Sequence, residues 1–188
     1  QDPCLSRTVR RWPGLRVPGT LDGFELAVRA ILGQQISVRG AVTLAGRLAI
    51  AYGSSVETPR PELHLLWPTP ERLAATKPSS LKRIGLRTMT AKGIQSLATA
   101  VLDQRITLEP GRDPVSMLPA LESLPGIGPW TAQYIALRAL RWPDAFPWGD
   151  LGLLKATRLS SSRELRKASE AWRPWRSYAA MYLWESLR

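Results

Sequence analysis

Two glycines one residue apart, Gly126 and Gly128, lie between apolar helical patterns, and a carboxylate, Asp150, follows 22 positions after the second glycine. A turn at such glycines can expose backbone amides with no side chain in the way, and amides at the start of the next helix attract a phosphate. Pro129 suits the first position of that helix. The pattern predicts a helix-hairpin-helix that grips a DNA backbone; a plain turn between antiparallel helices is the alternative, because such turns also favour Gly and Pro.

The charge of the chain favours a polyanionic partner. The 188 residues carry 26 Lys and Arg against 15 Asp and Glu, for a formal net charge of +11. Nucleic acid fits better than a membrane, because no apolar run approaches about 18 residues and no signal-like segment opens the chain. A single cysteine, Cys4, excludes a disulfide framework, a Cys-rich zinc site and a four-cysteine iron–sulfur cluster. An intracellular protein is the simplest interpretation.

The elements that must position these residues are expected to be helices. No stretch alternates β-branched residues at period two, so we predict an all-α fold. Residues 1–20 contain three prolines and little periodicity and are interpreted as a lead-in, followed by two helical subdomains over residues 21–188, with the hairpin at about 113–141. Capping and proline signals predict a helix opened by Asp22, then helices at about 37–52, 70–75, 78–83, 88–104, 114–123 and 129–141, and three more starting near 150, 161 and 174.

Three separated blocks resemble the helix-hairpin-helix DNA glycosylase superfamily. They are residues 124–132 with Tyr134, residues 136–138, and residues 146–151 ending at Asp150 and Leu151. Residues 28–35 and 172–178 strengthen the match to the 3-methyladenine DNA glycosylase II branch of bacterial alkylation repair. The similarity covers roughly residues 14–187 and implies a two-lobed helical fold, with the hairpin and Asp150 facing a shared cleft into which a nucleotide is extruded.

The resemblance implies that Asp150 stabilises positive charge on the sugar while the N-glycosidic bond breaks, and helps to position water. The alternative is a helix N-cap before Leu151, and both roles can hold together. Superfamily members that also cut the backbone use a lysine two residues after the second hairpin glycine, where this chain has Trp130. The expected activity is therefore a monofunctional N-glycosylase of the DNA-3-methyladenine glycosylase II type (EC 3.2.2.21 type), which leaves an abasic site, has no lyase activity and needs no cofactor.

The same resemblance implies a base pocket formed by Trp130, Tyr134 and Trp184, with Gln34 beside them. Alkylated purines carry positive charge, and electron-rich rings attract a flat cation. The alternative is that the tryptophans fill the core, which we expect for four others, while Trp148 is compatible with either role. The four expected core tryptophans are Trp12, Trp67, Trp142 and Trp172.

DNA contacts are expected from the hairpin and from a wedge residue. The wedge of the family is typically leucine, at the position where this chain has Gln35. The hairpin of the family also binds a monovalent cation, Na⁺ or K⁺, through backbone carbonyls. The expected hairpin contacts to DNA are Pro125, Gly126, Gly128 and Thr131, and the carbonyls that would hold the cation are those of Glu122, Leu124 and Ile127.

Double-stranded DNA with alkylated bases is the expected partner of a monomeric enzyme in a bacterial cytoplasm, near the nucleoid. The β-rich N-terminal domain that family members often carry is absent from these residues. The alternative function is a non-catalytic helix-hairpin-helix module of a larger repair protein. His64, in a proline-rich stretch, is expected at the surface, and Asp144 and Glu185 are interpreted as solvated ions rather than as a second active carboxylate.

Overall fold

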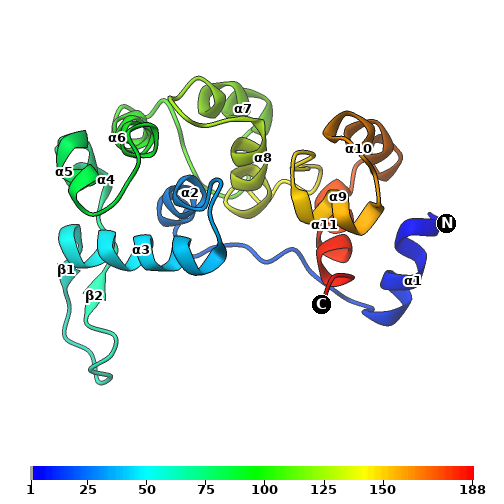
Figure 1. Cartoon of the computed structure of the whole chain (residues 1–188), viewed down its shortest axis with the longest axis horizontal. Coiled ribbons are helices and arrows are strands. Elements are labelled where there is room, and N and C mark those ends of the chain that lie inside the picture. Colours follow the sequence, from blue (N-terminus) through cyan, green and yellow to red (C-terminus); the bar gives the residue numbers. More distant parts are fainter. Residues whose placement is uncertain (1) are drawn as a thin grey trace.

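The computed structural model describes residues 2–188, and this part of the chain is mostly helical, as predicted (Figure 1). No helix within that range is long and apolar enough to cross a membrane. In chain order the elements are α1 (Pro3–Arg11), α2 (Gly23–Leu32), α3 (Val38–Tyr52), β1 (Ser54–Ser55), β2 (Leu65–Leu66), α4 (Pro70–Ala74), α5 (Pro78–Arg83), α6 (Thr88–Leu102), α7 (Pro114–Glu122), α8 (Pro129–Arg138), α9 (Leu151–Thr157), α10 (Ser162–Ser169), the 3₁₀ turn η1 (Glu170–Trp172) and α11 (Arg176–Glu185).

Two hydrophobic cores meet at α8. Helices α2 to α7 surround the first core, which Ala132 and Ile135 enter from α8. Helices α9 to α11 surround the second core, which Ala136 and Leu137 enter from the next face of α8. The two lobes lie on either side of α8 in Figure 1. Because residues four apart share a helix face, Trp130 and Tyr134 lie together on a third face of α8, which neither core covers completely.

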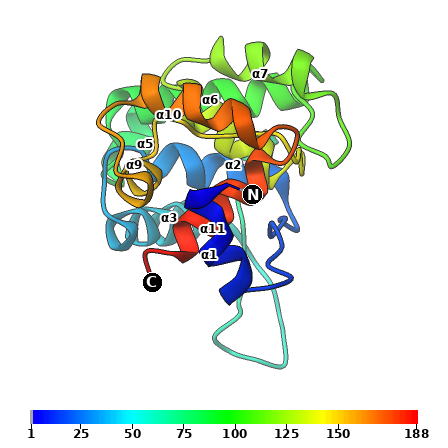
Figure 2. The same ribbon diagram turned by 90° about the vertical axis from the view of Figure 1, so that its right-hand side faces the viewer.

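The first half of residues 1–20, interpreted as a lead-in from its low periodicity, contains the helix α1. Helix α1 packs against α11, so that the N-terminal segment belongs to the C-terminal lobe (Figures 1 and 2). Trp172 Nε1 donates a hydrogen bond to Asp2 Oδ2 at 2.7 Å across this contact. An extended segment then leads to α2 in the other lobe. The docking site is formed by residues about 170 positions later, which no local pattern reveals.

The segment between α3 and α4, for which the sequence predicts no helix, contains one short antiparallel pair. Ser54 pairs with Leu66 and Ser55 with Leu65, and the residues between the strands project away from the helices as a finger (Figures 1 and 2). His64 is exposed on this finger, as predicted. Too few residues alternate in each strand for a period-two pattern to be visible in the sequence.

Capping residues explain most helix starts. Asp22 accepts hydrogen bonds from the amides of Phe24 and Glu25, and Ser161 accepts one from the amide of Glu164, so both predicted N-caps are confirmed. The predicted start of the last helix at Pro174 is two residues early, because α11 begins at Arg176 after the turn η1.

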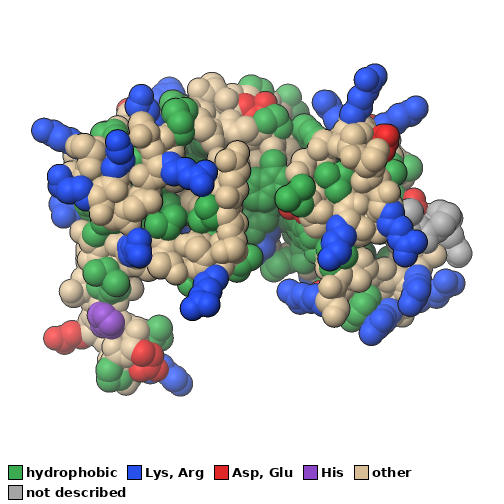
Figure 3. All heavy atoms as spheres, viewed as in Figure 1, with side chains coloured by type: hydrophobic (Ala, Val, Ile, Leu, Met, Phe, Trp, Pro, Cys, Tyr) green, Lys and Arg blue, Asp and Glu red, His purple; other side chains and the backbone are tan. Residues whose placement is uncertain are grey.

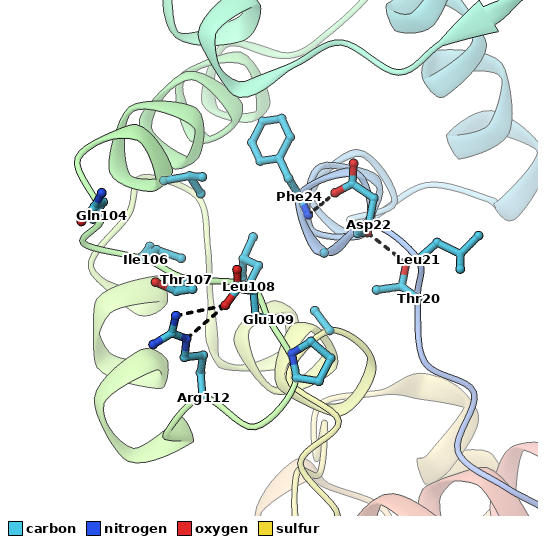
Figure 4. Close-up of a pocket in the computed structure, with 14 residues that line it drawn as sticks. Thr20, Leu21, Asp22, Phe24, Gln104, Ile106, Thr107, Leu108, Glu109 and Arg112 are labelled. Carbon is cyan, nitrogen blue, oxygen red and sulfur yellow. Dashed lines mark hydrogen bonds and ion pairs between the residues drawn. The ribbon is translucent and has the colours of Figure 1, made fainter.

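Two hollows on the surface of residues 2–188 are relevant to the site. The cleft between the lobes is visible in Figure 3, with hydrophobic side chains inside it and Lys and Arg on both sides. A separate pocket of about 830 Å³ lies between residues 20–24 and residues 104–112 (Figure 4). In that pocket Arg112 pairs with Glu109 at 3.0 Å, and Asp22 is occupied in capping α2. Because its charged groups already have partners and the predicted site residues lie elsewhere, the second pocket is not the candidate site.

Candidate active site

The cleft between the lobes has a volume of about 1270 Å³ and collects most of the predicted site residues. The cleft is lined by the loop between α2 and α3, by the first turn of α8 and by the N-terminus of α9. Val42 is 62% exposed and also lines the cleft. The predicted site residues that line it are Gln34, Gln35, Gly128, Trp130, Thr131, Tyr134 and Asp150.

Asp150 is both the N-cap of α9 and a cleft residue, so its two predicted placements coexist. Oδ1 accepts hydrogen bonds from the Leu153 amide and from Trp184 Nε1, each at 2.9 Å, and Oδ2 accepts one from Trp130 Nε1 at 3.0 Å. Three hydrogen bonds to one carboxylate fix its orientation. Oδ2 keeps one acceptor direction beyond its single donor. A negatively charged side chain of fixed orientation therefore lines a largely apolar cleft.

The aromatic side chains form one packed group around that charge. The rings of Trp130 and Tyr134 stack, with centroids 5.4 Å apart and planes 10° apart. The rings of Tyr134 and Trp184 pack edge to face, with centroids 6.4 Å apart. Trp130 and Tyr134 line the cleft, whereas Trp184 is not among its lining residues and reaches it only through Asp150 and Tyr134. The arrangement gives Trp184 a supporting place beside the predicted pocket rather than a place on its surface.

Gly152 is a residue of the candidate site that sequence reasoning missed. A Cβ at this position would lie 3.0 Å from Asp150 Oδ1 and 3.3 Å from Trp184 Cδ1. The missing side chain thus leaves room for the indole to reach the carboxylate. A glycine in the first turn after a capping aspartate was the available signal, because glycine is unfavourable in a helix without such a reason.

For the base excision that the resemblance implies, replacing Trp130 by Phe is expected to lower the rate by about ten-fold or more, because a hydrogen bond to a charged group contributes about 1.5–3 kcal/mol. Phenylalanine keeps the stacking on Tyr134 but cannot donate to Asp150. Single-turnover excision and DNA affinity should be measured together. An equal fall in the excision rate and in DNA affinity would show that the size of the Trp130 ring, and not its indole N–H, causes the effect.

The glycine turn, residues 124–128, is shaped by the two predicted glycines in different ways. Gly126 has φ +74°, which L side chains rarely adopt, and a Cβ there would meet the Met89 carbonyl oxygen at 3.3 Å. Gly128 has φ −93° and no heavy atom within 4 Å of an added Cβ, so its place in the turn is open to the outside. Gly128 also begins α8 without a side-chain cap, which leaves the first amides of the helix to an external acceptor.

Gln34 and Thr131 line the cleft and also stabilise the glycine turn. Gln34 Nε2 donates to the Gly126 carbonyl at 2.9 Å and to Thr131 Oγ1 at 2.8 Å. Thr131 is 2% exposed, and its hydroxyl anchors Gln34. A contact between Thr131 and DNA stays a prediction. The end of α2 is thereby tied to the hairpin across the cleft.

Gln35, the predicted wedge, is exposed at the cleft edge in a left-handed conformation with φ 56°. Such a conformation is uncommon for a residue with a side chain and is found where the surroundings require it. The conformation belongs to the turn that reverses the chain between α2 and α3. Insertion of this side chain into DNA remains a prediction.

The carbonyls predicted to hold a monovalent cation are compatible with that role. The Leu124 oxygen accepts the Ile127 amide at 3.2 Å and keeps a second lone pair. Within residues 2–188, no backbone amide outside the helices donates to the oxygens of Glu122 or Ile127. Carbonyl oxygens are suitable ligands for Na⁺ or K⁺, so these residues fit the group.

The loop that carries Asp150 is fastened to both neighbouring helices. Gln133 Oε1 accepts the Phe146 amide at 2.9 Å, and Ser177 Oγ lies within hydrogen-bonding distance of the carbonyls of Trp142 and Ala145, at 2.7 and 2.8 Å. All of these groups are buried or half-buried. Sequence reasoning missed Gln133 and Ser177, since their partners follow no helical spacing.

Asp144 was predicted to be a solvated ion, and the structure contradicts this. It is 6% exposed and forms a two-point ion pair with Arg176, which is equally buried, at 2.7 and 2.9 Å. Arg173 adds a contact to Asp144 at 2.7 Å and another to Glu170. The Arg173 hydrogen bond, with the charges of Arg173 and Arg176, holds the pKa of Glu170 below its ordinary value. The stabilisation from Glu170 is therefore present at neutral pH and lost as the pH falls through that lowered pKa.

The remaining tryptophans lie mostly where they were expected. Trp172 is buried in the second core, and Trp67 and Trp142 pack partly buried against the two cores. Trp12 is half-exposed beneath the Arg11 guanidinium, so the prediction of a core position is wrong for it. Trp148 packs on the second core under Arg166 and does not line the cleft.

The sequence of this chain matches those of known proteins. The model of the HhH-GPD superfamily of base excision DNA repair proteins matches residues 28–174. The chain is 44% identical, over 99% of its length, to the probable bifunctional transcriptional activator/DNA repair enzyme AlkA of Mycobacterium tuberculosis, and 40% identical, over 96%, to DNA-3-methyladenine glycosylase 2 of Escherichia coli. It spans 38% and 64% of the lengths of these two relatives.

Solved structures agree with the fold. The 3-methyladenine DNA-glycosylase of Archaeoglobus fulgidus superimposes with a TM-score of 0.78 at 26% identity, covering 97% of this chain and 65% of that one. The Clostridium acetobutylicum 8-oxoguanine glycosylase/lyase, in complex with double-stranded DNA, superimposes with a TM-score of 0.83 at 20% identity, covering 97% of this chain and 65% of that one. At this identity the likeness concerns the fold alone. The chain belongs to the HhH-GPD superfamily of base excision DNA repair proteins.

Proposed function

We propose that this chain is a monofunctional DNA glycosylase that extrudes alkylated bases from double-stranded DNA and hydrolyses their N-glycosidic bond. The observation that carries the proposal is Asp150, an anionic side chain fixed by three donors inside an aromatic cleft beside the glycine turn. The two relatives named as AlkA and DNA-3-methyladenine glycosylase 2 support the choice of alkylated bases. The proposed enzyme acts as a monomer and needs no catalytic cofactor, and Na⁺ or K⁺ at the glycine turn would serve DNA binding only.

The chemistry follows from the fixed charge. When the bond between C1′ and the base nitrogen breaks, the electron pair leaves with the base and the sugar becomes positive. The carboxylate of Asp150 stabilises that charge without reorganising, because its hydrogen bonds are formed beforehand. Water then adds to C1′ and gives up a proton, leaving an abasic site. A base that is already cationic leaves as a neutral molecule, so no general acid is required.

The presence of Trp130, rather than lysine, supports the proposal that the enzyme has no lyase activity. A Schiff base to C1′ needs an amine, and the indole nitrogen at this position donates its hydrogen to Asp150 instead. The test is borohydride treatment of the enzyme with methylated DNA, together with gel analysis of the strand. We expect no covalent protein–DNA product and a strand that breaks only after alkaline treatment. Trapped covalent product would overturn the monofunctional assignment.

Gly128→Ala is expected to weaken DNA binding by about ten-fold while leaving stability nearly unchanged. The added methyl group meets no protein atom but stands in front of the open amides of α8, where a phosphate would lie. Titration of duplex DNA at several salt concentrations measures the effect. Gly46→Ala is the matched control, because Gly46 is exposed in α3 and its added methyl group is equally free of contacts. Equal affinities of the two variants would contradict a phosphate site at the turn.

The second candidate is a non-catalytic DNA-binding module of a larger repair protein, which is compatible with the chain spanning only part of its relatives. A binding module needs the glycine turn but not Asp150 with its indole donors. Incubation of the chain with methylated duplex DNA and chromatography of free bases separates the two candidates. Binding without release favours the module.

A further inference from the structure

Arg138, in the last turn of α8, contacts Tyr134, which lines the cleft, and is not itself a lining residue. Its Nη1 donates a hydrogen bond to the Tyr134 hydroxyl at 3.3 Å, and its Cζ lies 5.8 Å from the centroid of the same ring. The residue is half-buried, and its Nε is buried with no hydrogen-bond partner among residues 2–188. A cation near a helix C-terminus is favourable in general, but that does not explain a guanidinium turned back onto Tyr134.

The charge of Arg138 is not neutralised by an acidic side chain. Arg176, a buried arginine, forms ion pairs with Asp144 and Glu170. Within the described part of the chain, Arg138 forms no ion pair and donates its hydrogen bond to a neutral hydroxyl. Its positive charge therefore acts on whatever occupies the space beyond Tyr134. Partly buried charges are screened less than exposed ones.

The hydrogen bond also sets the direction of the Tyr134 proton. Arginine has donors only, so the Tyr134 oxygen must accept, and its own O–H is directed elsewhere. The indole N–H groups of Trp130 and Trp184 are both donated to Asp150. Among the three aromatic residues, Tyr134 is thus the one whose proton can be offered to an acceptor atom of a base in the cleft.

The two effects favour the same class of base. A formally cationic base is attracted by the rings and by Asp150 but repelled by Arg138, whereas a neutral base with a carbonyl oxygen or an unprotonated ring nitrogen can accept the Tyr134 hydrogen. We infer that Arg138 is a positioning residue that, through Tyr134, shifts the selectivity of the pocket from cationic bases toward neutral bases bearing a hydrogen-bond acceptor. The inference rests on the proposed glycosylase function.

The test compares single-turnover excision of 7-methylguanine, which is cationic, with that of hypoxanthine, which is neutral, from otherwise identical duplexes. Arg138→Gln should raise the ratio of the two rates by about five-fold in favour of 7-methylguanine, while Arg138→Lys, which keeps the charge, should leave it within about two-fold of wild type. Arg141→Gln is the matched control, since Arg141 is an exposed arginine three positions further on. An unchanged ratio in Arg138→Gln, or the same change in Arg138→Lys, would overturn the inference.

Tyr134→Phe tests the hydroxyl separately and serves if Arg138→Gln does not fold. It removes the donated hydrogen and keeps the charge, so hypoxanthine excision should fall at least about three-fold more than 7-methylguanine excision. Equal falls would overturn the role of the hydroxyl. A wild type that releases neither base would instead refute the proposed function, so the two failures are distinguishable.

Discussion

Replacement of Asp150 by Asn is expected to lower the single-turnover rate of base release by about 100-fold or more, in the range known for loss of one preorganised charge-stabilising group. The amide cannot supply the negative charge that the cationic sugar requires. Its nitrogen would also face Trp130 Nε1, so that two donors oppose each other where Oδ2 now accepts. The rate is measured with enzyme in excess over methylated duplex DNA.

The fold of this variant should remain intact, because asparagine caps a helix as well as aspartate does and its oxygen can still accept from Leu153 and Trp184. DNA affinity should stay the same or rise slightly, since a negative charge facing the phosphate backbone has been removed. A loss of affinity or a clear fall in unfolding temperature would mean that Asp150 serves structure more than chemistry.

Replacement of Asp144 by Ala is expected to lower the free energy of unfolding by about 3–5 kcal/mol, the usual result of leaving one partner of a buried ion pair alone. Arg176 would lose the acceptors of its Nε and Nη2 groups and keep only Glu170. For a chain of this length the change corresponds to a fall of about 10 °C in unfolding temperature. Calorimetry or denaturant unfolding measures it.

Glu109→Ala provides the control for that prediction. Glu109 also pairs with an arginine, Arg112, but both side chains are more than half exposed, and such pairs contribute about 0–1 kcal/mol. If Asp144→Ala were no less stable than Glu109→Ala, the buried network would not be what fastens the loop before Asp150. Excision should fall in Asp144→Ala even below its unfolding temperature, because the loop would lose one of its anchors.

The parts of the fold that were predictable are those with local signals. Asp22 and Ser161 precede helices as capping residues. The glycines indicated a tight turn, and Gly126 indeed has the positive φ that favours glycine. Asp150 was recognised because the resemblance placed it at a fixed distance behind the hairpin. Its position as an N-cap was available from its immediate neighbours alone.

What was not predictable depends on contacts between distant residues. Helix α1 is short and largely polar, and its packing on α11 helps to stabilise it. Asp144 resembled any solvated acid, because its partner Arg176 lies 32 positions later. The same holds for the indole hydrogen bonds to Asp150, since nothing in the spacing of Trp184 indicates that its N–H, rather than its ring face, is used.

The central claim is that this chain excises alkylated bases and that Asp150 carries the reaction. The most direct measurement is the release of 3-methyladenine and 7-methylguanine from one methylated duplex preparation by wild type and Asp150→Asn side by side, with DNA binding followed in the same samples. Both proteins should bind, and only the wild type should release free base at an appreciable rate, leaving an uncut abasic strand. Equal release by the two proteins, or binding without release by the wild type, would contradict the account.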